Sequence, residues 1–191
     1  MTTGETPPTI ADPLQKNMRR AALLAGVILA AVTATVVIVI RGKGHDAAGF
    51  LGPGTLVADV NLALEILLVL GVTFGFWLAR SGSIEAHRVN QTSWVLVNAA
   101  LVALIMISSM ENVAIAKIAD LANPRTAFAW LHAALGACTV AAGLWLVLQM
   151  NDVLPGRMHL RRWKMLMRLT LAGYWAVGLL GFTTYYFFYV A

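Results

Sequence analysis

Hydrophobic residues gather in long runs along the chain, and short polar segments separate these runs. The plainest run, residues 21–40, holds only aliphatic side chains, glycine and threonine, with no charge. A helix that rises about 1.5 Å per residue needs about 20 mostly apolar residues to cross the hydrocarbon core of a bilayer. Five runs reach this length, and they cover residues 21–40, 57–79, 92–116, 127–148 and 169–190.

These runs predict an all-α integral membrane bundle of five transmembrane helices. They lack the alternation that a barrel strand requires, and lipid offers no partner to unpaired backbone groups. Residues 1–15 carry three prolines and no apolar period, so we expect a disordered N-terminal tail followed by a membrane domain over residues 16–191. Basic residues precede the first run, as in a signal peptide, but the run exceeds a usual signal sequence. We therefore expect a retained helix.

The basic residues indicate how the bundle is oriented, because Lys and Arg stay on the cytoplasmic side during insertion. Ten of the 14 basic residues fall in the tail, the second loop and the fourth loop: Lys16, Arg19, Arg20, Arg80, Arg88, Arg157, Arg161, Arg162, Lys164 and Arg168. We expect the N-terminus in the cytoplasm and the C-terminus outside, in the cytoplasmic (inner) membrane of a bacterium.

Composition narrows the classes of function. Hydrophobic residues make up 59% of the chain and charged residues only 12%, which leaves too few polar residues for a separate soluble domain. The net charge is +5, but the charged residues lie between the apolar runs, as membrane topology requires. We therefore expect membrane lipids as partners and do not expect nucleic acid. The single Cys138 cannot form an internal disulfide and is expected to be a small packing group. The sequence contains no common hydrolase, phosphate-binding or metalloprotease motif, so we do not expect an enzyme.

Ionisable residues inside the apolar runs are the strongest functional signal. An ionised side chain at the bilayer centre costs about 2.5–3.5 kcal/mol on insertion scales, so such residues usually face the bundle interior and have a function. Glu65 lies about two turns inside the second run, Glu111 lies toward the end of the third, and His132 lies near the start of the fourth. The predicted orientation places all three in the outer half of the bundle.

The chemistry of these three side chains suits a divalent metal or proton exchange, so we predict a metal site formed by Glu65, Glu111 and His132. Small residues support an inward direction for His132, because Gly136 and Gly143 share its helix face. The alternative is that these side chains are hydrogen-bonded at helix contacts. Asp59, at the start of the second run, is explained by the favourable helix dipole.

Two further histidines precede apolar runs on the predicted cytoplasmic side. His87 lies before the third run and His159 before the fifth, each among basic residues and followed by a Trp. This similarity suggests a weak repeat of two helical hairpins. The two histidines are candidates for cofactor binding, and haem is the group that imidazole ligands on transmembrane helices would hold. The alternative is a basic loop that binds anionic headgroups.

Part of the chain resembles a known family. The resemblance rests on Asn61, on the segment Leu78-Ala79-Arg80-Ser81-Gly82-Ser83-Ile84-Glu85-Ala86-His87-Arg88, on His132, and on a final His-plus-basic turn that leads into Leu169-Thr170 and a last helix with Gly and Tyr. Over about residues 57–190 the chain is similar to the four-helix membrane proteins designated domain of unknown function 420, some of which are linked to maturation of haem-copper terminal oxidases. That family carries an extra His at the outer end of the third span, where this chain has Ser108-Ser109-Met110-Glu111-Asn112, and the family's Trp-Thr-aromatic-Pro in the last helix is absent.

The resemblance implies an accessory or assembly membrane protein of a respiratory haem-copper terminal oxidase, holding copper or haem near its outer face. Two alternatives remain open. One is a structural subunit of a larger membrane redox complex with no cofactor of its own. The other is a b-haem electron-transfer protein. The positions of His45, His87 and His159 argue against it, because they lie in loops or at interfaces, whereas the axial ligands of a buried haem lie inside spans.

Overall fold

The computed structural model describes residues 11–42, 47–107 and 118–191, and these residues are helical apart from short connections. Helix α1 spans Ala11–Arg41, α2 spans Leu56–Arg80, α3 spans Ile84–Leu101, α5 spans Pro124–Met150 and α6 spans Trp163–Tyr189. A π-helix, η1 (Val102–Met106), continues α3, and two short 3-10 helices, η3 (Ile118–Ala122) and η4 (Gly156–Met158), precede α5 and α6. Five of these segments are long and apolar enough to cross a membrane, so the predicted all-α multi-pass architecture is confirmed.

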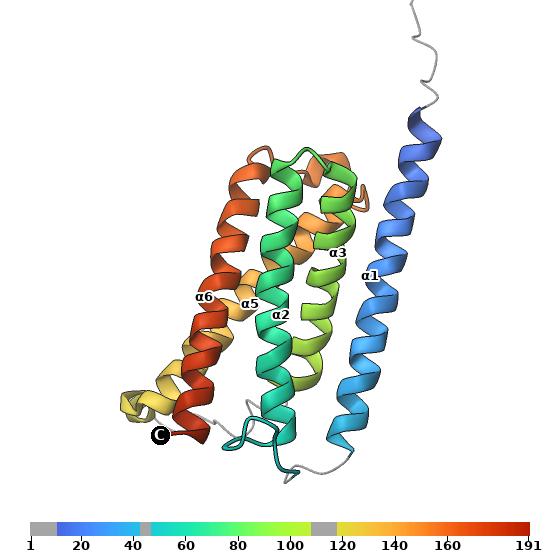
Figure 1. Cartoon of the computed structure of the whole chain (residues 1–191). Coiled ribbons are helices and arrows are strands. Elements are labelled where there is room, and N and C mark those ends of the chain that lie inside the picture. The colour runs from blue at the N-terminus through green and yellow to red at the C-terminus, as the bar shows by residue number, and fades with distance from the viewer. Residues whose placement is uncertain (1–10, 43–46, 108–117) are drawn as a thin grey trace, which may run out of the picture.

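Helices α2, α3, α5 and α6 form a four-helix bundle, and α1 lies outside it against α3 (Figure 1). Successive helices of the bundle run in opposite directions, and α1 runs parallel to α3. We call the end where α1 begins the amino-terminal end, which also holds the α2–α3 and α5–α6 connections. The opposite end, where α6 finishes, is the carboxyl-terminal end and holds the α1–α2 loop (Figure 1).

Helix α1 is a peripheral helix that packs along α3. Only 11% of its most apolar window is buried, so most of its surface is available to lipid. Gly26 allows close approach to α3, because a side chain there would press on Thr92 and Ser93. Ion pairing of Arg19 with Asp152 attaches its start, and a hydrogen bond from the Arg41 guanidinium to the carbonyl of Leu104 attaches its end.

Glycines and amides hold α2 and α3 together. A side chain at Gly71 would collide with the ring of Trp94, so the two backbones can approach only because residue 71 is glycine. Asn90 and Gln91 then donate side-chain hydrogen bonds to the carbonyls of Gly71 and Val72, at 2.8 and 2.9 Å. These two hydrogen bonds fix the register of α3 against α2, the helix that carries Glu65.

Local sequence signals account for the ends of the helices. Thr55 caps α2 by accepting a hydrogen bond from the backbone of Ala58, and Asn123 caps α5 in the same way, with Pro124 in the first turn. Gly82, with φ of +83°, makes the turn between α2 and α3.

Three helix boundaries differ from the sequence-based expectation. Residues 11–15, assigned above to the tail, are helical, and Pro13 falls in the first turn, where its missing N–H has no cost. Helix α3 begins eight residues before residue 92, because Glu85 pairs with Arg88 within its first turn and His87 is buried. Helix α6 begins at Trp163, six residues before the apolar run.

The face of α5 that carries Gly136 and Gly143 is directed toward other helices, as predicted. Gly143 lies against Val95 and the hydroxyl of Tyr174, and Gly173 lies against Thr139. The packing role expected for Cys138 is wrong, because its side chain is exposed on the outer face of α5.

Candidate functional site

Glu65 lies largely buried between α2 and α6. It lies more than two turns inside an apolar helix, and only 14% of its side chain is exposed. A side chain at Gly181 of α6 would collide with the Glu65 carboxylate, so this glycine creates the space that the acid occupies. The prediction that Glu65 faces the protein interior is therefore confirmed.

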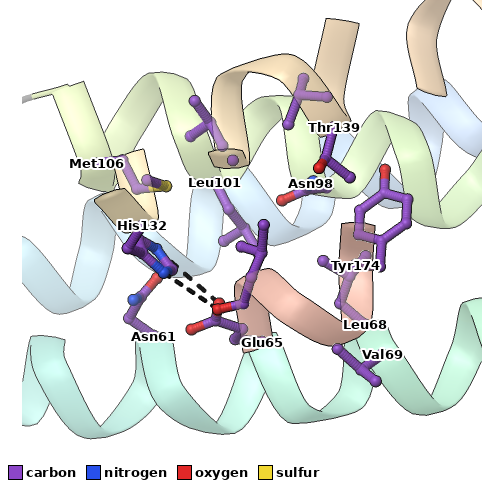
Figure 2. A pocket seen from close by; sticks show the side chains of 14 residues that line it. Asn61, Glu65, Leu68, Val69, Asn98, Leu101, Met106, His132, Thr139 and Tyr174 are labelled. Carbon is purple, nitrogen blue, oxygen red and sulfur yellow. Dashed lines mark hydrogen bonds and ion pairs between the residues drawn. The ribbon is translucent and has the colours of Figure 1, made fainter. Parts of the chain in front are cut away.

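His132 of α5 lies opposite Glu65, and its ring is also buried, with 12% of the side chain exposed. The Nδ1 atom donates a hydrogen bond of 3.1 Å to the carbonyl of Val177 on α6. Its Nε2 atom lies 4.0 Å from Oε1 of Glu65, a contact that is among the interactions drawn with dashed lines in Figure 2. Three helices thus position the acid and the imidazole toward one another.

The two side chains share a cavity of about 30 Å³ inside the four-helix bundle. This volume holds an ion or one to two water molecules, since a single water needs about 10–15 Å³. The polar residues on its wall are Asn61, Asn98, Thr139 and Tyr174, and Met106 brings a thioether (Figure 2). The other lining residues are apolar, so the cavity is a small polar region within a dry bundle.

Glu111, the third predicted ligand, lies outside the described residues. Within residues 11–42, 47–107 and 118–191, no group of three or more His, Cys, Asp and Glu side chains is close enough together to hold a metal ion. The structure therefore brings together two of the three predicted ligands, and the metal role of all three stays a prediction. A bare ion fits the donors and the volume of the cavity, whereas a porphyrin ring is much larger than this space.

His87 and His159 lie at the amino-terminal end, away from the cavity. The Nδ1 atom of His87 donates a hydrogen bond of 2.7 Å to the carbonyl of Gly75, and the ring is buried between α2 and α3. The Nε2 atom of His159 donates to the carbonyl of Leu154, at 3.0 Å, on the exposed surface. Each imidazole thus binds the backbone of its own hairpin. Their role in cofactor binding stays a prediction.

Asp59 belongs to a second buried polar cluster, at the carboxyl-terminal end. The expectation that the helix dipole alone explains it was incomplete, because the residue is fully buried. Its carboxylate accepts hydrogen bonds from the Tyr185 hydroxyl and from the backbone N–H of Leu51, both at 2.6 Å. Gly49 and Gly54 bring the α1–α2 loop against this carboxylate. The start of α2 is thereby joined to the end of α6.

Sequence reasoning missed several residues that complete the site. Asn98 carries a signal that was available, because an amide in the middle of an apolar run is unusual. Met106 and Tyr174 carry no such signal, since both residue types are common in membrane helices. Comparison of the chain with protein-family models, with curated proteins and with solved structures finds no match.

Proposed function

We propose that this protein is a non-enzymatic accessory or assembly protein of a respiratory haem-copper terminal oxidase, and that it holds a metal ion between Glu65 and His132. The observation that carries the metal site is the buried acid that faces a buried imidazole across a cavity of ionic size. The resemblance of residues 57–190 to oxidase-linked membrane proteins supplies the partner complex. A bacterial cytoplasmic membrane is the corresponding location.

The hydrogen bond of His132 to Val177 supports this role. A backbone carbonyl can only accept, so Nδ1 carries the proton and Nε2 keeps its lone pair when the ring is neutral. Ligand histidines in metalloproteins commonly donate their second nitrogen to a carbonyl or a carboxylate in this way. The lone pair of Nε2 then faces a carboxylate oxygen at 4.0 Å, and both atoms are acceptors. A metal ion, whose bonds to nitrogen and oxygen are about 2.0–2.2 Å long, can lie between them and bind both.

A deletion strain tests the proposal. We expect loss of terminal oxidase activity and of the oxidase haem spectrum in membranes, with recovery when the wild-type gene is returned. Complementation with Glu65→Gln or His132→Gln is expected to fail, whereas Glu85→Gln, in an ion pair at the amino-terminal end, is expected to succeed. Metal analysis of the purified proteins is expected to find a bound ion in the wild type and in Glu85→Gln, and none in Glu65→Gln or His132→Gln. Normal oxidase in the deletion strain would contradict the proposal.

A second candidate is a structural subunit of a larger redox complex without its own cofactor. The observation in its favour is that both polar residues bind α6, with Glu65 against Gly181 and His132 bonded to Val177, so both also hold helices together. This function predicts permanent co-purification with the complex and normal activity of Glu65→Gln. The experiment above therefore separates the two functions.

A further inference from the structure

This inference rests on the proposed role of Glu65 and His132 in metal binding. The charge of the side chains that line the cavity restricts the charge of an ion that can bind there. Among the described lining residues, Glu65 is the only one that can supply a negative charge. Net charge in an apolar interior is costly. One carboxylate neutralises one positive charge, so a monovalent cation leaves the cavity neutral, whereas a divalent cation leaves an excess of one charge.

Two ligand atoms of the cavity, the His132 nitrogen and the Met106 sulfur, favour a soft ion. Imidazole nitrogen and thioether sulfur bind Cu(I) well, while Na⁺ and other hard cations prefer oxygen ligands. Besides Nε2 of His132, the described lining residues offer one sulfur atom, that of Met106. The terminal methyl group of Met106 would lie 3.6 Å from a Cβ built at Gly136, one turn after His132 on the same helix. The thioether therefore lies beside the face of α5 that carries the imidazole.

An unusual turn of backbone positions Met106. It is the last residue of η1, and π-helical turns inside α-helices are rare and are often found at functional sites. Helix α1, which lies outside the four-helix bundle, contacts this turn: the guanidinium of Arg41 donates a hydrogen bond to the carbonyl of Leu104 in η1. Leu101, Val102 and Met106 from this region all line the cavity (Figure 2).

We propose that the cavity binds one cuprous ion, with Nε2 of His132 and the sulfur of Met106 as ligands and with the Glu65 carboxylate balancing its charge. The single available negative charge and the pairing of one nitrogen with one sulfur donor match Cu(I). The oxygen atoms of the other polar lining residues complete the polar part of the wall, and these residues are Asn61, Asn98, Thr139 and Tyr174. No change of oxidation state is part of this proposal.

The test is metal titration of the purified full chain in detergent, with Cys138→Ser in every sample so that the exposed thiol cannot bind copper. The protein is first stripped with a chelator, and Cu(I) is then added without oxygen in competition with a coloured Cu(I) chelator. Zn²⁺ is titrated separately. We expect one Cu(I) per chain, held more tightly than Zn²⁺. Met106→Leu conserves volume and removes only the sulfur, so it is expected to weaken Cu(I) binding about tenfold or more. Met167→Leu, which lines a different cavity, is the matched control.

X-ray absorption of the Cu(I) complex supplies a second measurement, which leaves the proposed ligands His132 and Met106 unchanged. It is made in the Cys138→Ser background, so that the exposed thiol cannot bind copper. A sulfur neighbour of copper supports the proposal, and neighbours of nitrogen and oxygen alone overturn it.

The outcomes distinguish this inference from the proposed function. Unchanged Cu(I) affinity in Met106→Leu, or a preference for Zn²⁺ that depends on His132, would overturn the cuprous assignment and leave the metal site intact. No bound ion of either kind would overturn both the cuprous assignment and the metal site, while the oxidase defect of the deletion strain would still test the accessory role.

Discussion

Asp59 and Tyr185 show how a single hydrogen bond can join distant parts of the bundle. The bond connects the first turn of α2 with the last turns of α6, and the carboxylate is fully buried. Hydrogen bonds to charged groups contribute about 1.5–3 kcal/mol to stability, and leaving a buried partner unsatisfied adds to the loss.

Removal of this hydroxyl is therefore expected to be costly. Tyr185→Phe should lower the free energy of unfolding by about 1.5–3 kcal/mol, measured by denaturant titration in detergent. Tyr186→Phe is the control, because that side chain is 48% exposed and lies one position along the same helix. Equal stability of the two variants would show that the bond to Asp59 does not stabilise the bundle.

Gly181 allows a second test at the scale of the residue. Gly181→Ala places a methyl group where the Glu65 carboxylate lies, so the acid must leave its present position opposite His132. We expect at least tenfold weaker metal binding, because displacement of supporting groups costs about 10–100-fold in affinity.

The control for this change is Gly156→Ala, whose added methyl group meets nothing within 4 Å. Overpacking costs about 1–3 kcal/mol, which the better helix propensity of alanine partly offsets, so both variants are expected to fold. Metal affinity that is the same in Gly181→Ala and in the wild type would contradict a role for the Glu65 position.

Residue type explains which site residues the sequence could reveal. Glu65 and His132 are out of place in apolar runs, so their inward direction could be predicted. Met106 and Tyr185 are ordinary residues for a membrane helix and its interface, and only their neighbours in the fold distinguish them. The partner of Asp59 lies 126 residues away, at a distance that no local pattern encodes.

The π-helix is the element on which the geometry of the cavity depends. Its wide turn interrupts the regular backbone hydrogen bonds of the third span, and Arg41 supplies a donor to the carbonyl of Leu104. Helix α1 is thus connected to the cavity, although none of its residues lines the cavity.

Replacement of this donor tests the connection. Arg41→Gln is expected to lower the free energy of unfolding by about 1–3 kcal/mol, because it removes a charged donor from a carbonyl of the π-helix. Metal affinity is expected to fall as Met106 shifts. Arg20→Gln, an exposed residue near the other end of the same helix, is the control. Identical thermal stability and metal affinity in the two variants would argue against this role of α1.

Predictability differs between elements for a physical reason. The five helices could be predicted because lipid permits few structures other than long apolar helices. The starts of α3 and α6 could not, because their first turns carry charged residues that resemble a loop. In α3 those residues are used within the fold, where Glu85 pairs with Arg88 and His87 bonds to α2. A π-helix has no reliable signature in sequence.

At the scale of the whole molecule, charge is distributed unequally between the two ends. Helix and loop residues at the amino-terminal end carry ten basic side chains, from Lys16 to Arg168, whereas Arg41 and Arg125 are the described basic residues toward the carboxyl-terminal end. The inner leaflet attracts such basic segments and the insertion machinery retains them. This asymmetry supports the predicted orientation.

Reporter fusions measure that orientation. Alkaline phosphatase joined after residue 191 is expected to be active, and a green fluorescent protein at the same position is expected to be dark, because the C-terminus should face outward. Both reporters inserted at Gly82, in the α2–α3 turn, are expected to give the opposite result. A fluorescent C-terminal fusion would mean that the bundle has the reverse orientation.

The hydrogen bond between Asp59 and Tyr185 also has a consequence for biogenesis. The acid enters the bilayer with the second span, long before the ribosome has made the tyrosine, which follows 126 residues later. During that interval the nascent chain contains a carboxylate that lacks its hydroxyl donor. Insertion of α6 supplies the donor and joins the start of α2 to the end of α6. A translation product that stops before Tyr185 would retain an acid that lacks this donor, and membrane quality control would be able to distinguish it from a product that contains α6.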